Sequence, residues 1–287
     1  MRKNKIIFWF FITPAIISFL LIVVVPAAMG FFYSFTDWNG LSDNKNFVGL
    51  NNFTQIFLDE RYIHSLYFTA AVAFVSIILI NTVAILLALL VTQKFKGCNF
   101  LRSLFFMPNL IGGLLLGFTW RFIFTKIFAT IAKITGLGFL NSWLTSTTTG
   151  FWGIVIVNVW QMSGYMMLIY IAQLQQIPSS VKEAAKIDGA GAFQTFRNIT
   201  FPLIMPAFTI GVFLSIANSF KMFDQNIALT DGAPYHSTEM LALNIYSTAF
   251  SSNQLGLAQA KSIIFLLIVA TVGVTQLIIT KRKEVEM

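Results

Sequence analysis

Charged side chains are scarce in this chain of 287 residues, because Asp, Glu, Lys and Arg together make up only 10% of it. No Asp or Glu lies inside any of its long apolar runs, and Asp224 lies at the border of one. Ion-coupled carriers commonly hold a carboxylate at membrane depth to bind the coupling cation. The absence of such a group weighs against an ion-coupled secondary transporter of a small polar solute, which we keep as the alternative to the function inferred below. It also indicates that a partner supplies the energy for any transport.

Residues for covalent and metal chemistry are also few. Cys98 is the single cysteine, so the chain forms no intrachain disulfide. His64 and His236 are far apart in sequence, and no cluster of His, Cys and acidic residues suggests a metal site. The phosphate-binding pattern G-x-x-x-x-G-K-[ST] is absent, and no catalytic triad can be assembled. These absences disfavour a membrane-embedded enzyme or a structural protein, and we expect a chain that is not an enzyme and binds no cofactor.

Apolar residues are abundant. They make up 56% of the chain, which has 31 Phe and a mean hydropathy of +0.76. This composition predicts an all-α, polytopic membrane protein. Six uncharged runs reach or approach the roughly 20 residues that a helix needs to cross a bilayer; they cover residues 6–35, 66–91, 104–120 with its flanks, 151–174, 201–220 and 262–280. The first run resembles a signal peptide but is too long for a cleaved one, so we expect an uncleaved span.

The positive charges lie at the ends of these runs, which indicates that they set topology and does not suggest a nucleic-acid partner. Twelve of the 19 Lys and Arg fall in segments on one side of the membrane and seven on the other. Cytoplasmic loops carry the excess of Lys and Arg. Both termini and the loop before residue 201 are therefore predicted to be cytoplasmic. In the outer segment 126–150, an apolar pattern of Ile127, Phe128, Ile131 and Ile134 suits a helix lying in the membrane interface.

The segment from Gln175 to Pro206 reads as helix, tight turn, helix. Ser180 stands three residues before Glu183, which predicts a capping box and a helix that starts just after Pro178. Gly189 predicts a reversal of the chain. The pattern after it predicts a second helix over residues 190–199, ended by Pro202 and Pro206.

This segment resembles the EAA loop of permease subunits from bacterial ABC importers. The matching positions are Glu183-Ala184-Ala185, Asp188-Gly189-Ala190, Phe196, Ile199, Pro202 and Pro206. Other matches cover nearly the whole chain: residues 47–53 (F-V-G-L-N-N-F), Arg102 with 105–108, 140–144, and 223–256. The last run is similar to the carbohydrate branch of the family, with maltose, multiple-sugar and glycerol-phosphate permeases. It departs from that branch at Ala233, where a second Gly is usual.

The resemblance implies an ABC importer type I permease fold with six transmembrane helices in a bacterial cell membrane. Residues 1–61 would form the first helix and outer loop, 62–280 the permease core with a coupling loop at about 176–202, and 281–287 a cytoplasmic tail. It also implies a second permease subunit, two ATPase subunits that carry ATP and Mg, an extracytoplasmic sugar-binding protein, and import of a sugar or oligosaccharide by alternating access.

Two groups of residues are expected to form the functional sites. The coupling loop would contact the ATPase through Glu183, Ala184, Ala185, Asp188, Gly189 and Ala190, with Gly189 permitting the turn. Uncharged polar and aromatic residues at helical spacing would line the substrate path: Asn158, Gln161, Met162, Tyr165, Ser215, Asn218, Ser219 and Met222. Amides, hydroxyls and a ring suit sugars. The alternative is that these groups join helices by hydrogen bonds.

Overall fold

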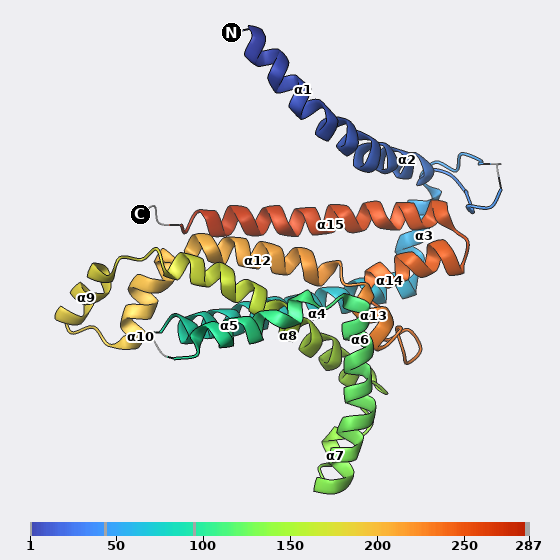
Figure 1. The fold of residues 1–287 in the computed structure, drawn as a ribbon. Helices are drawn as coiled ribbons and strands as arrows, with labels where there is room; N and C mark the ends of the chain where they lie inside the picture. The colour runs from blue at the N-terminus through green and yellow to red at the C-terminus, as the bar shows by residue number, and fades with distance from the viewer. Residues whose placement is uncertain (1, 43–44, 94–95, 285–287) are drawn as a thin grey trace. The chain divides into compact units, whose positions relative to one another are not determined.

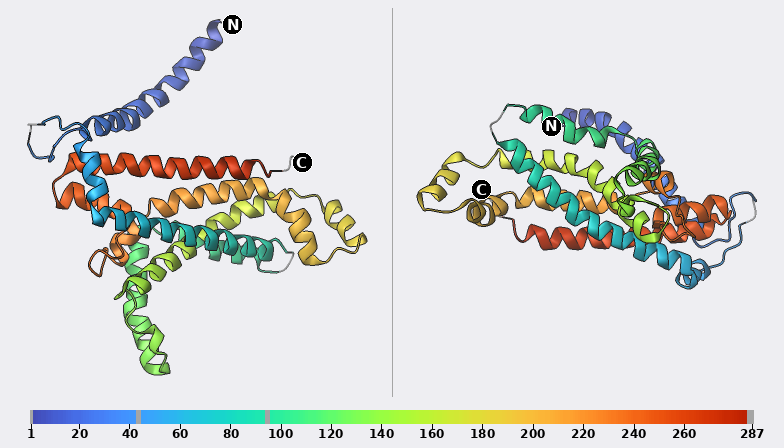
Figure 2. Two further views of the ribbon diagram at one scale, coloured as in Figure 1. Left: turned by 180° about the vertical axis from the view of Figure 1, so that it is seen from behind. Right: turned by 90° about the horizontal axis from the view of Figure 1, so that it is seen from below.

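The structure is a computed structural model that describes residues 2–42, 45–93 and 96–284, with the backbone alone for residues 2–7 and Lys182. Lys94, counted among the topology-setting cations, and the last three residues of the predicted tail lie outside the described residues. The described chain is helical, with one isolated bridge between Thr36 and Phe47 (Figures 1 and 2). It divides into two compact units, Met1–Ile63 with Asn244–Leu266, and His64–Leu243 with Leu267–Met287.

The first unit begins with one continuous apolar helix made of α1 (Arg2–Phe19), the π-helical turn η1 (Leu20–Val24) and α2 (Val25–Tyr33). Proline lacks an N–H and its ring clashes with the carbonyl four residues earlier in an α-helix. The wider π turn directly before Pro26 removes that clash, so the helix continues through it. Residues 8–33 are long and apolar enough to cross a membrane.

The F-V-G-L-N-N-F run after this helix folds back onto its end. Gly49 takes a positive φ of 58° and α3 (Asn51–Leu58) follows. The buried Asn52 side chain donates two hydrogen bonds of 2.8 Å, to the Ser34 and Thr36 carbonyls. The amide therefore satisfies carbonyls left open where α2 ends, which explains an Asn in this motif.

A buried cation organises the rest of the first unit. Lys261 on α15 (Leu255–Lys281) is 2% exposed, and its Nζ donates to Asp59 Oδ2 at 2.7 Å, Asn244 Oδ1 at 3.0 Å and Thr248 Oγ1 at 2.9 Å. Asp59 also accepts from the Tyr62 N–H, and so caps α4 (Glu60–Thr92). Lys261 is one of the seven Lys and Arg predicted on the outer side, and no pattern in the sequence predicted its pairing with Asp59.

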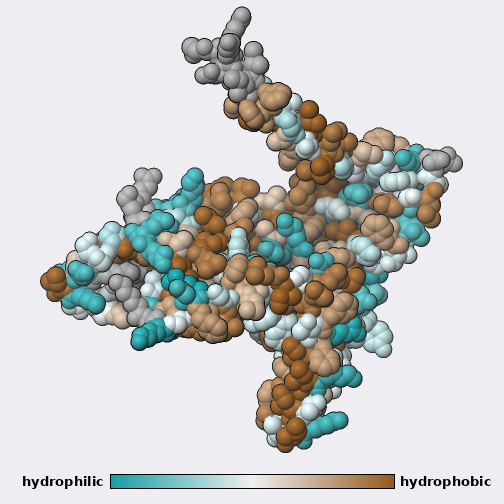
Figure 3. Space-filling view, in the orientation of Figure 1, coloured by the Kyte–Doolittle hydropathy of each residue, from teal (hydrophilic) through white to brown (hydrophobic). Residues whose placement is uncertain are grey.

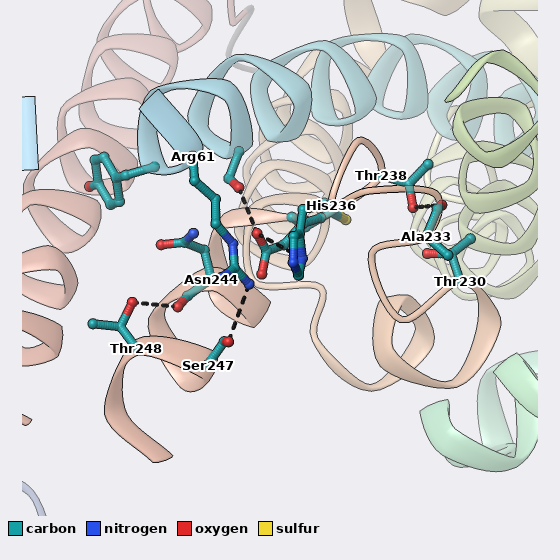
Figure 4. Close-up of polar contacts among 12 residues, drawn as sticks. Arg61, Thr230, Ala233, His236, Thr238, Asn244, Ser247 and Thr248 are labelled. Atoms are coloured by element: carbon teal, nitrogen blue, oxygen red, sulfur yellow. Dashed lines mark hydrogen bonds and ion pairs between the residues drawn. The ribbon is translucent and has the colours of Figure 1, made fainter. Parts of the chain in front are cut away.

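Figure 4 shows the neighbouring contacts of α14 (Leu241–Tyr246) and the π turn η6 (Ser247–Ser251). Thr248 Oγ1 donates to the Asn244 carbonyl at 2.9 Å, and Arg61 Nη2 donates to Ser247 Oγ at 3.2 Å. These bonds fix the turn that presents Asn244 and Thr248 to Lys261.

In the second unit, α8 (Thr147–Leu174) packs against α4, α5 (Cys98–Phe106) and α12 (Met205–Phe220) (Figures 1 and 2). The α5 backbone rests directly on α8, because a Cβ added at Gly164 would overlap the carbonyl oxygen of Phe105. The later part of α15 joins α12 through a hydrogen bond of 3.3 Å from Gln276 Nε2 to the Thr209 carbonyl.

The predicted third span, residues 104–120, is not one continuous helix, so that prediction is wrong. After α5 come the 3-10 turn η2 (Met107–Leu110), two extended residues at Ile111 and Gly112, and then α6 (Gly113–Phe122), the π turn η3 (Ile123–Ile127) and α7 (Phe128–Thr135). The chain turns at this break because α6 packs onto α13 (Asp224–Leu229). A Cβ at Gly113 or Gly117 would lie only 2.6 Å from the Cβ of Asp224 or Ala228.

Two further loops connect the helices of this unit. The turn η4 (Gly138–Leu140) leads to Ser146, which caps α8 in a reciprocal pair with Thr149. After α13, the Asn226 side chain donates to the Thr238 carbonyl at 2.9 Å and accepts from the Met240 N–H at 3.0 Å. The Asn226 amide thus closes the loop that contains Ala233. The peptide bond between Ala233 and Pro234 is cis, and the Ala233 carbonyl accepts a hydrogen bond from Thr238 Oγ1 (Figure 4).

The fifth predicted span, residues 201–220, is also broken. The short helices α10 (Ala192–Thr195) and α11 (Phe201–Leu203) are joined by the π turn η5 (Phe196–Thr200), and this helix meets α12 at Ile204 with a bend of 72°. Pro202 lies inside the first helix and Pro206 in the first turn of α12, so the helix ends at Leu203 instead of before Pro202. Among the described residues, five helices are long and apolar enough to cross a membrane, and this bent pair makes a sixth.

Both breaks expose backbone carbonyls, and both are covered by glutamines of α8. Gln161 Nε2 donates to the Ile111 carbonyl at 3.1 Å, and Gln173 Nε2 donates to the Leu203 carbonyl at 3.3 Å. An unsatisfied carbonyl in a membrane interior costs several kcal/mol, on the order of the values for transfer to hydrocarbon. The two glutamines therefore allow α8 to hold two interrupted helices in place.

The Lys261 contacts generate a stability prediction. Asp59→Asn keeps an acceptor for the Tyr62 N–H but leaves the buried ammonium unpaired, so we expect it to destabilise the protein by about 3 kcal/mol. The double variant Asp59→Asn/Lys261→Met should recover most of that loss. Unfolding in detergent measures both, with Asp37→Asn as control, because Asp37 is a carboxylate that accepts two hydrogen bonds from the neutral Asn46. Equal losses in the single and double variants would contradict the pairing.

The same pair predicts a pH dependence. Burial by itself raises the pKa of Asp59, but the hydrogen bond from Lys261, the Tyr62 N–H and the Lys261 charge outweigh it and hold the pKa below 3.8. A lowered carboxyl pKa stabilises the folded state above the ordinary pKa and loses that effect as pH falls through the folded value. We expect stability to drop below pH about 3.8 in the native chain, and this component to be missing in Asp59→Asn.

Candidate functional site

The coupling loop starts with α9 (Ser179–Ile187), which begins directly after Pro178 as predicted. The predicted capping box is wrong, because Pro178 is the N-cap, no side chain caps the helix, and Ser180 is already the second helical residue. A capping serine must stand one residue before the helix, with an extended backbone. Here the proline supplies that extended residue, with ψ of 140°.

The end of α9 is closed by backbone bonds around Gly189. Gly189 has φ of +78°, its N–H donates to the Lys186 carbonyl at 3.1 Å, and the Ala190 N–H donates to the Ala185 carbonyl at 2.9 Å. This pair of bonds is the Schellman motif, in which the residue after the helix adopts the left-handed conformation. The predicted reversal at Gly189 is confirmed, and its cause is the glycine's freedom to take a positive φ.

The tip of the loop leaves apolar side chains uncovered. Glu183, Ala184 and Asp188 are exposed, whereas Ala185 is buried. Ile187 is 85% exposed and Phe193 on α10 is 74% exposed. Large exposed apolar side chains rimmed by polar ones mark protein-interaction surfaces. Ile187 is not among the residues predicted to contact the ATPase, although its spacing of four residues from Glu183 puts both on one helix face.

Behind the tip, the loop is anchored to the bundle. Phe196 packs against the α4–α8 core and contacts the Phe201 ring at 5.9 Å between centroids. A groove of about 620 Å³ separates the loop helices from the ends of α4 and α8; its lining includes Leu89, Thr92, Leu174, Lys186, Ala190 and Phe196. The loop is thus a folded projection, with one face held and one face open.

The polar face of α8 bonds to neighbouring helices. Asn158 Nδ2 donates to Ser219 Oγ on α12 at 3.0 Å. Gln161 accepts from Gln225 Nε2 of α13 at 2.8 Å, in addition to covering the Ile111 carbonyl. Met162 is buried, and its sulfur accepts from Asn109 Nδ2 at 3.8 Å.

On α12, Ser215 belongs to a chain of hydrogen bonds that joins three helices. Tyr170 OH donates to Asn81 Oδ1 at 2.5 Å, Asn81 Nδ2 donates to Ser215 Oγ at 3.2 Å, and Ser215 Oγ donates to the Gly211 carbonyl at 2.7 Å. All three side chains are buried. Asn81 and Tyr170 are not among the residues predicted to line the path.

The eight predicted path residues therefore fall into two groups. Asn158, Gln161, Met162, Ser215, Ser219 and Met222 are buried between helices. Tyr165, 37% exposed, and Asn218 lie at the surface of the second unit. The structure brings Asn158 of α8 and Ser219 of α12 together in a hydrogen bond. The side chains of Tyr165 and Asn218 stay exposed.

Comparison with families of known proteins gives one match over most of the chain. Residues 80–285 match the family described as "Binding-protein-dependent transport system inner membrane component". The chain belongs to this family. The finding confirms the resemblance carried by the EAA loop, and it makes the chain a multi-pass membrane component of a transport system.

Individual relatives extend over the full length. The chain is 50% identical over 285 residues, 99% of its length and 97% of the relative's, to the "Probable starch degradation products transport system permease protein AmyD" of Thermoanaerobacterium thermosulfurigenes. It is 32% identical, over 98% of both chains, to the "Multiple sugar-binding transport system permease protein MsmF" of Streptococcus mutans.

A solved structure confirms the predicted fold. The chain superimposes with a TM-score of 0.86, at 20% identity and over 98% of its length and 96% of the other chain, on a chain of a bacterial ABC transporter involved in the import of the acidic polysaccharide alginate. The predicted all-α ABC importer permease fold is therefore confirmed. The described residues contain no group of three or more His, Cys, Asp or Glu that is arranged to hold a metal ion.

The Gly189 geometry generates a prediction that isolates backbone conformation. A Cβ at Gly189 or at Gly191 would meet nothing within 4 Å, yet only Gly189 has a positive φ, since Gly191 has φ of −70°. A β-branched residue in the left-handed conformation costs about 1–2 kcal/mol. We expect Gly189→Val to speed amide hydrogen exchange at Ala190 about tenfold, and Gly191→Val to leave it unchanged. Equal exchange in both variants would contradict the turn described here.

Proposed function

We propose that this chain is a transmembrane permease subunit of an ATP-driven importer that moves a sugar or oligosaccharide into the cell by alternating access. The observation that carries the proposal is the coupling loop, a folded helix pair at one end of the second unit with an open, partly apolar tip (Figure 1). A chain without a phosphate-binding loop of its own needs such a surface to receive the work of ATP hydrolysis.

Two cytoplasmic ATPase subunits, with their ATP and Mg, bind this permease and a second homologous one. The α9 tip enters a groove on the ATPase, where Ile187 occupies an apolar pocket and Glu183 pairs with a basic side chain. The small side chains of Ala184 and Ala185 keep the helix slim, and Asp188, Gly189 and Ala190 form the turn that presents it. An extracytoplasmic binding protein delivers the sugar to the opposite end of the helices. Both termini then lie in the cytoplasm, as the distribution of Lys and Arg predicts.

The substrate class is supported by chemistry and by relatives. The names of two relatives refer to starch degradation products and to multiple sugars. The predicted path presents amides, hydroxyls and a tyrosine ring, which suit the hydroxyls and apolar faces of a sugar. We assign first contact to Tyr165 and Asn218, whose side chains are open. The bonded pair Asn158 and Ser219 becomes available when α8 and α12 separate during transport.

Copurification tests the coupling assignment. Ile187→Ser removes an exposed apolar side chain, so it should leave folding and membrane insertion unchanged while reducing the ATPase recovered with the permease at least tenfold. Gln194→Ser, at an exposed position of α10, is the matched control and should retain the ATPase. Full recovery of the ATPase with Ile187→Ser and with Glu183→Lys would refute the docking surface.

Transport kinetics test the path assignment. We expect Tyr165→Ala and Asn218→Ala to raise the KM for the sugar about tenfold, since each removes a substrate contact worth about 1.4 kcal/mol, without loss of stability. Asn81→Ala should leave the KM unchanged and lower the free energy of unfolding by about 1 kcal/mol, because the Asn81 amide joins three helices. An unchanged KM in both surface variants would assign the path to other residues.

A further inference from the structure

A helical arm in the second unit is left without a role by the proposed transport function. The arm consists of α6, η3 and α7, residues Gly113–Thr135, and it is long and apolar enough to cross a membrane. In Figures 1 and 2, however, it runs crosswise to α5, α8 and α12, at the end of the unit away from the coupling loop. If those helices cross the bilayer, the arm lies along its surface.

One face of the arm is already covered by the chain. Leu116 and Phe124 are buried, Gly117 packs against Ala228, and the Trp143 ring stacks on Phe124 with 4.9 Å between centroids. This packing fixes the orientation of the arm on the unit. The remaining faces are the ones that need a partner.

The open faces carry an apolar stripe. Leu115, Phe118 and Phe122 recur on one side of α6, and Ile127, Ile131 and Ile134 recur at helical spacing into α7; all six are exposed. Apolar atoms cover most of the visible arm in Figure 3, with hydrophilic atoms along its edges. Single exposed apolar residues are common on soluble proteins, but a continuous stripe of six indicates that this face lies in an apolar environment.

The hydroxyl groups of the arm are suited to that surrounding. Thr119, Thr125, Thr130 and Thr135 each donate to the carbonyl four residues earlier, at 2.7–2.9 Å. Each hydroxyl hydrogen is therefore satisfied inside the helix, and no water is needed to receive it.

The charges of the arm are all positive. Arg121, Lys126 and Lys133 are exposed, and residues 113–135 contain no Asp or Glu. Lys126 and Lys133 are about two turns apart, beside the isoleucine stripe instead of on it. Long cationic side chains at this position extend from an apolar layer to lipid headgroups, and a cluster without acids favours anionic headgroups.

We propose that the arm is a membrane-interface anchor that lies in the plane of the outer leaflet and does not cross the bilayer, so that α5 with η2 makes the third of the six crossings. The stripe of Leu, Phe and Ile enters the acyl chains, and Arg121, Lys126 and Lys133 bind anionic lipid headgroups. The placement in the outer leaflet rests on the orientation proposed above for the importer; the in-plane geometry and the lipid contacts do not.

Depth measurements distinguish the two geometries. Spin labels are placed singly along residues 115–134 of the assembled transporter in nanodiscs, in a Cys98→Ser background, because Cys98 is the only native thiol. We expect accessibility to oxygen and to a water-soluble nickel chelate to oscillate with the helical period, with Ile127, Ile131 and Ile134 deepest. A steady change of depth from 115 to 134 would show a transmembrane helix. Labels at Ile127, Ile131 and Ile134 that are shielded from both reagents would show that the open face is buried against a protein; either result overturns the proposal.

Lipid retention tests the headgroup assignment. In nanodiscs of phosphatidylglycerol mixed with phosphatidylcholine, native mass spectrometry of the transporter should show severalfold less bound phosphatidylglycerol for Lys126→Gln/Lys133→Gln. Lys221→Gln removes an exposed cation outside the arm and should change nothing. Equal retention in the double variant and the native chain would contradict anionic lipid binding. ATPase recovery in the double variant is expected to be normal, so failure here is separable from failure of the transport proposal.

Discussion

The constraint on which this structure depends is that a backbone carbonyl left open at a break in a helix needs a donor from another part of the protein wherever water is excluded. An unbroken helix meets that need within itself, but the chain interrupts two of its helices, at Ile111–Gly112 and at Ile204. Gln161 and Gln173 of α8 supply the missing donors. Because one straight helix serves both breaks, α8 becomes the element against which the interrupted helices are positioned.

The two breaks set the directions of the coupling loop and of α6, which both project from the helix bundle of the second unit. The break at Ile204 bends the chain by 72° between α12 and the helix of α10, η5 and α11, which belongs to the coupling loop. The break at Ile111 sends α6 onto α13, where Gly113 and Gly117 permit close packing. The bend at Ile204 connects the coupling loop to α12, and α12 bonds to α4 and α8 through Ser215, Asn81 and Ser219. Under the proposed function, we expect this connection to carry the effect of ATPase docking to the predicted sugar path.

The sequence predicted much of this because its strongest signals are local. Long uncharged apolar runs predict membrane spans, because burying a charge in a membrane is costly. The EAA pattern predicted a turn at Gly189, and the positive φ of Gly189 confirms that turn. Other features depend on contacts between distant residues. The burial of Lys261 needs Asp59, which is 202 residues away in sequence. Gln161 reads as a path residue from its helical spacing alone, and nothing local in the sequence shows that it covers a carbonyl at position 111.

The capping box at Ser180 and the helix end at Pro202 failed because both depend on the register of a single residue. Pro178 takes the N-cap, which moves Ser180 inside α9. Pro202 follows directly on the π turn η5 and lies inside the helix that ends at Leu203, instead of ending that helix before it. Whether the polar stripe contacts sugar stays a prediction, because hydrogen bonds between helices account for its buried members in this conformation.

The most direct test of the central claim is uptake of labelled sugar into proteoliposomes that contain this chain with its second permease and ATPase subunits, supplied with binding protein. We predict uptake that requires ATP on the coupling-loop side and persists when every ion gradient is collapsed. Uptake that proceeds without the ATPase, and stops when an ion gradient is dissipated, would contradict an ATP-driven importer and leave the coupling loop without its proposed role.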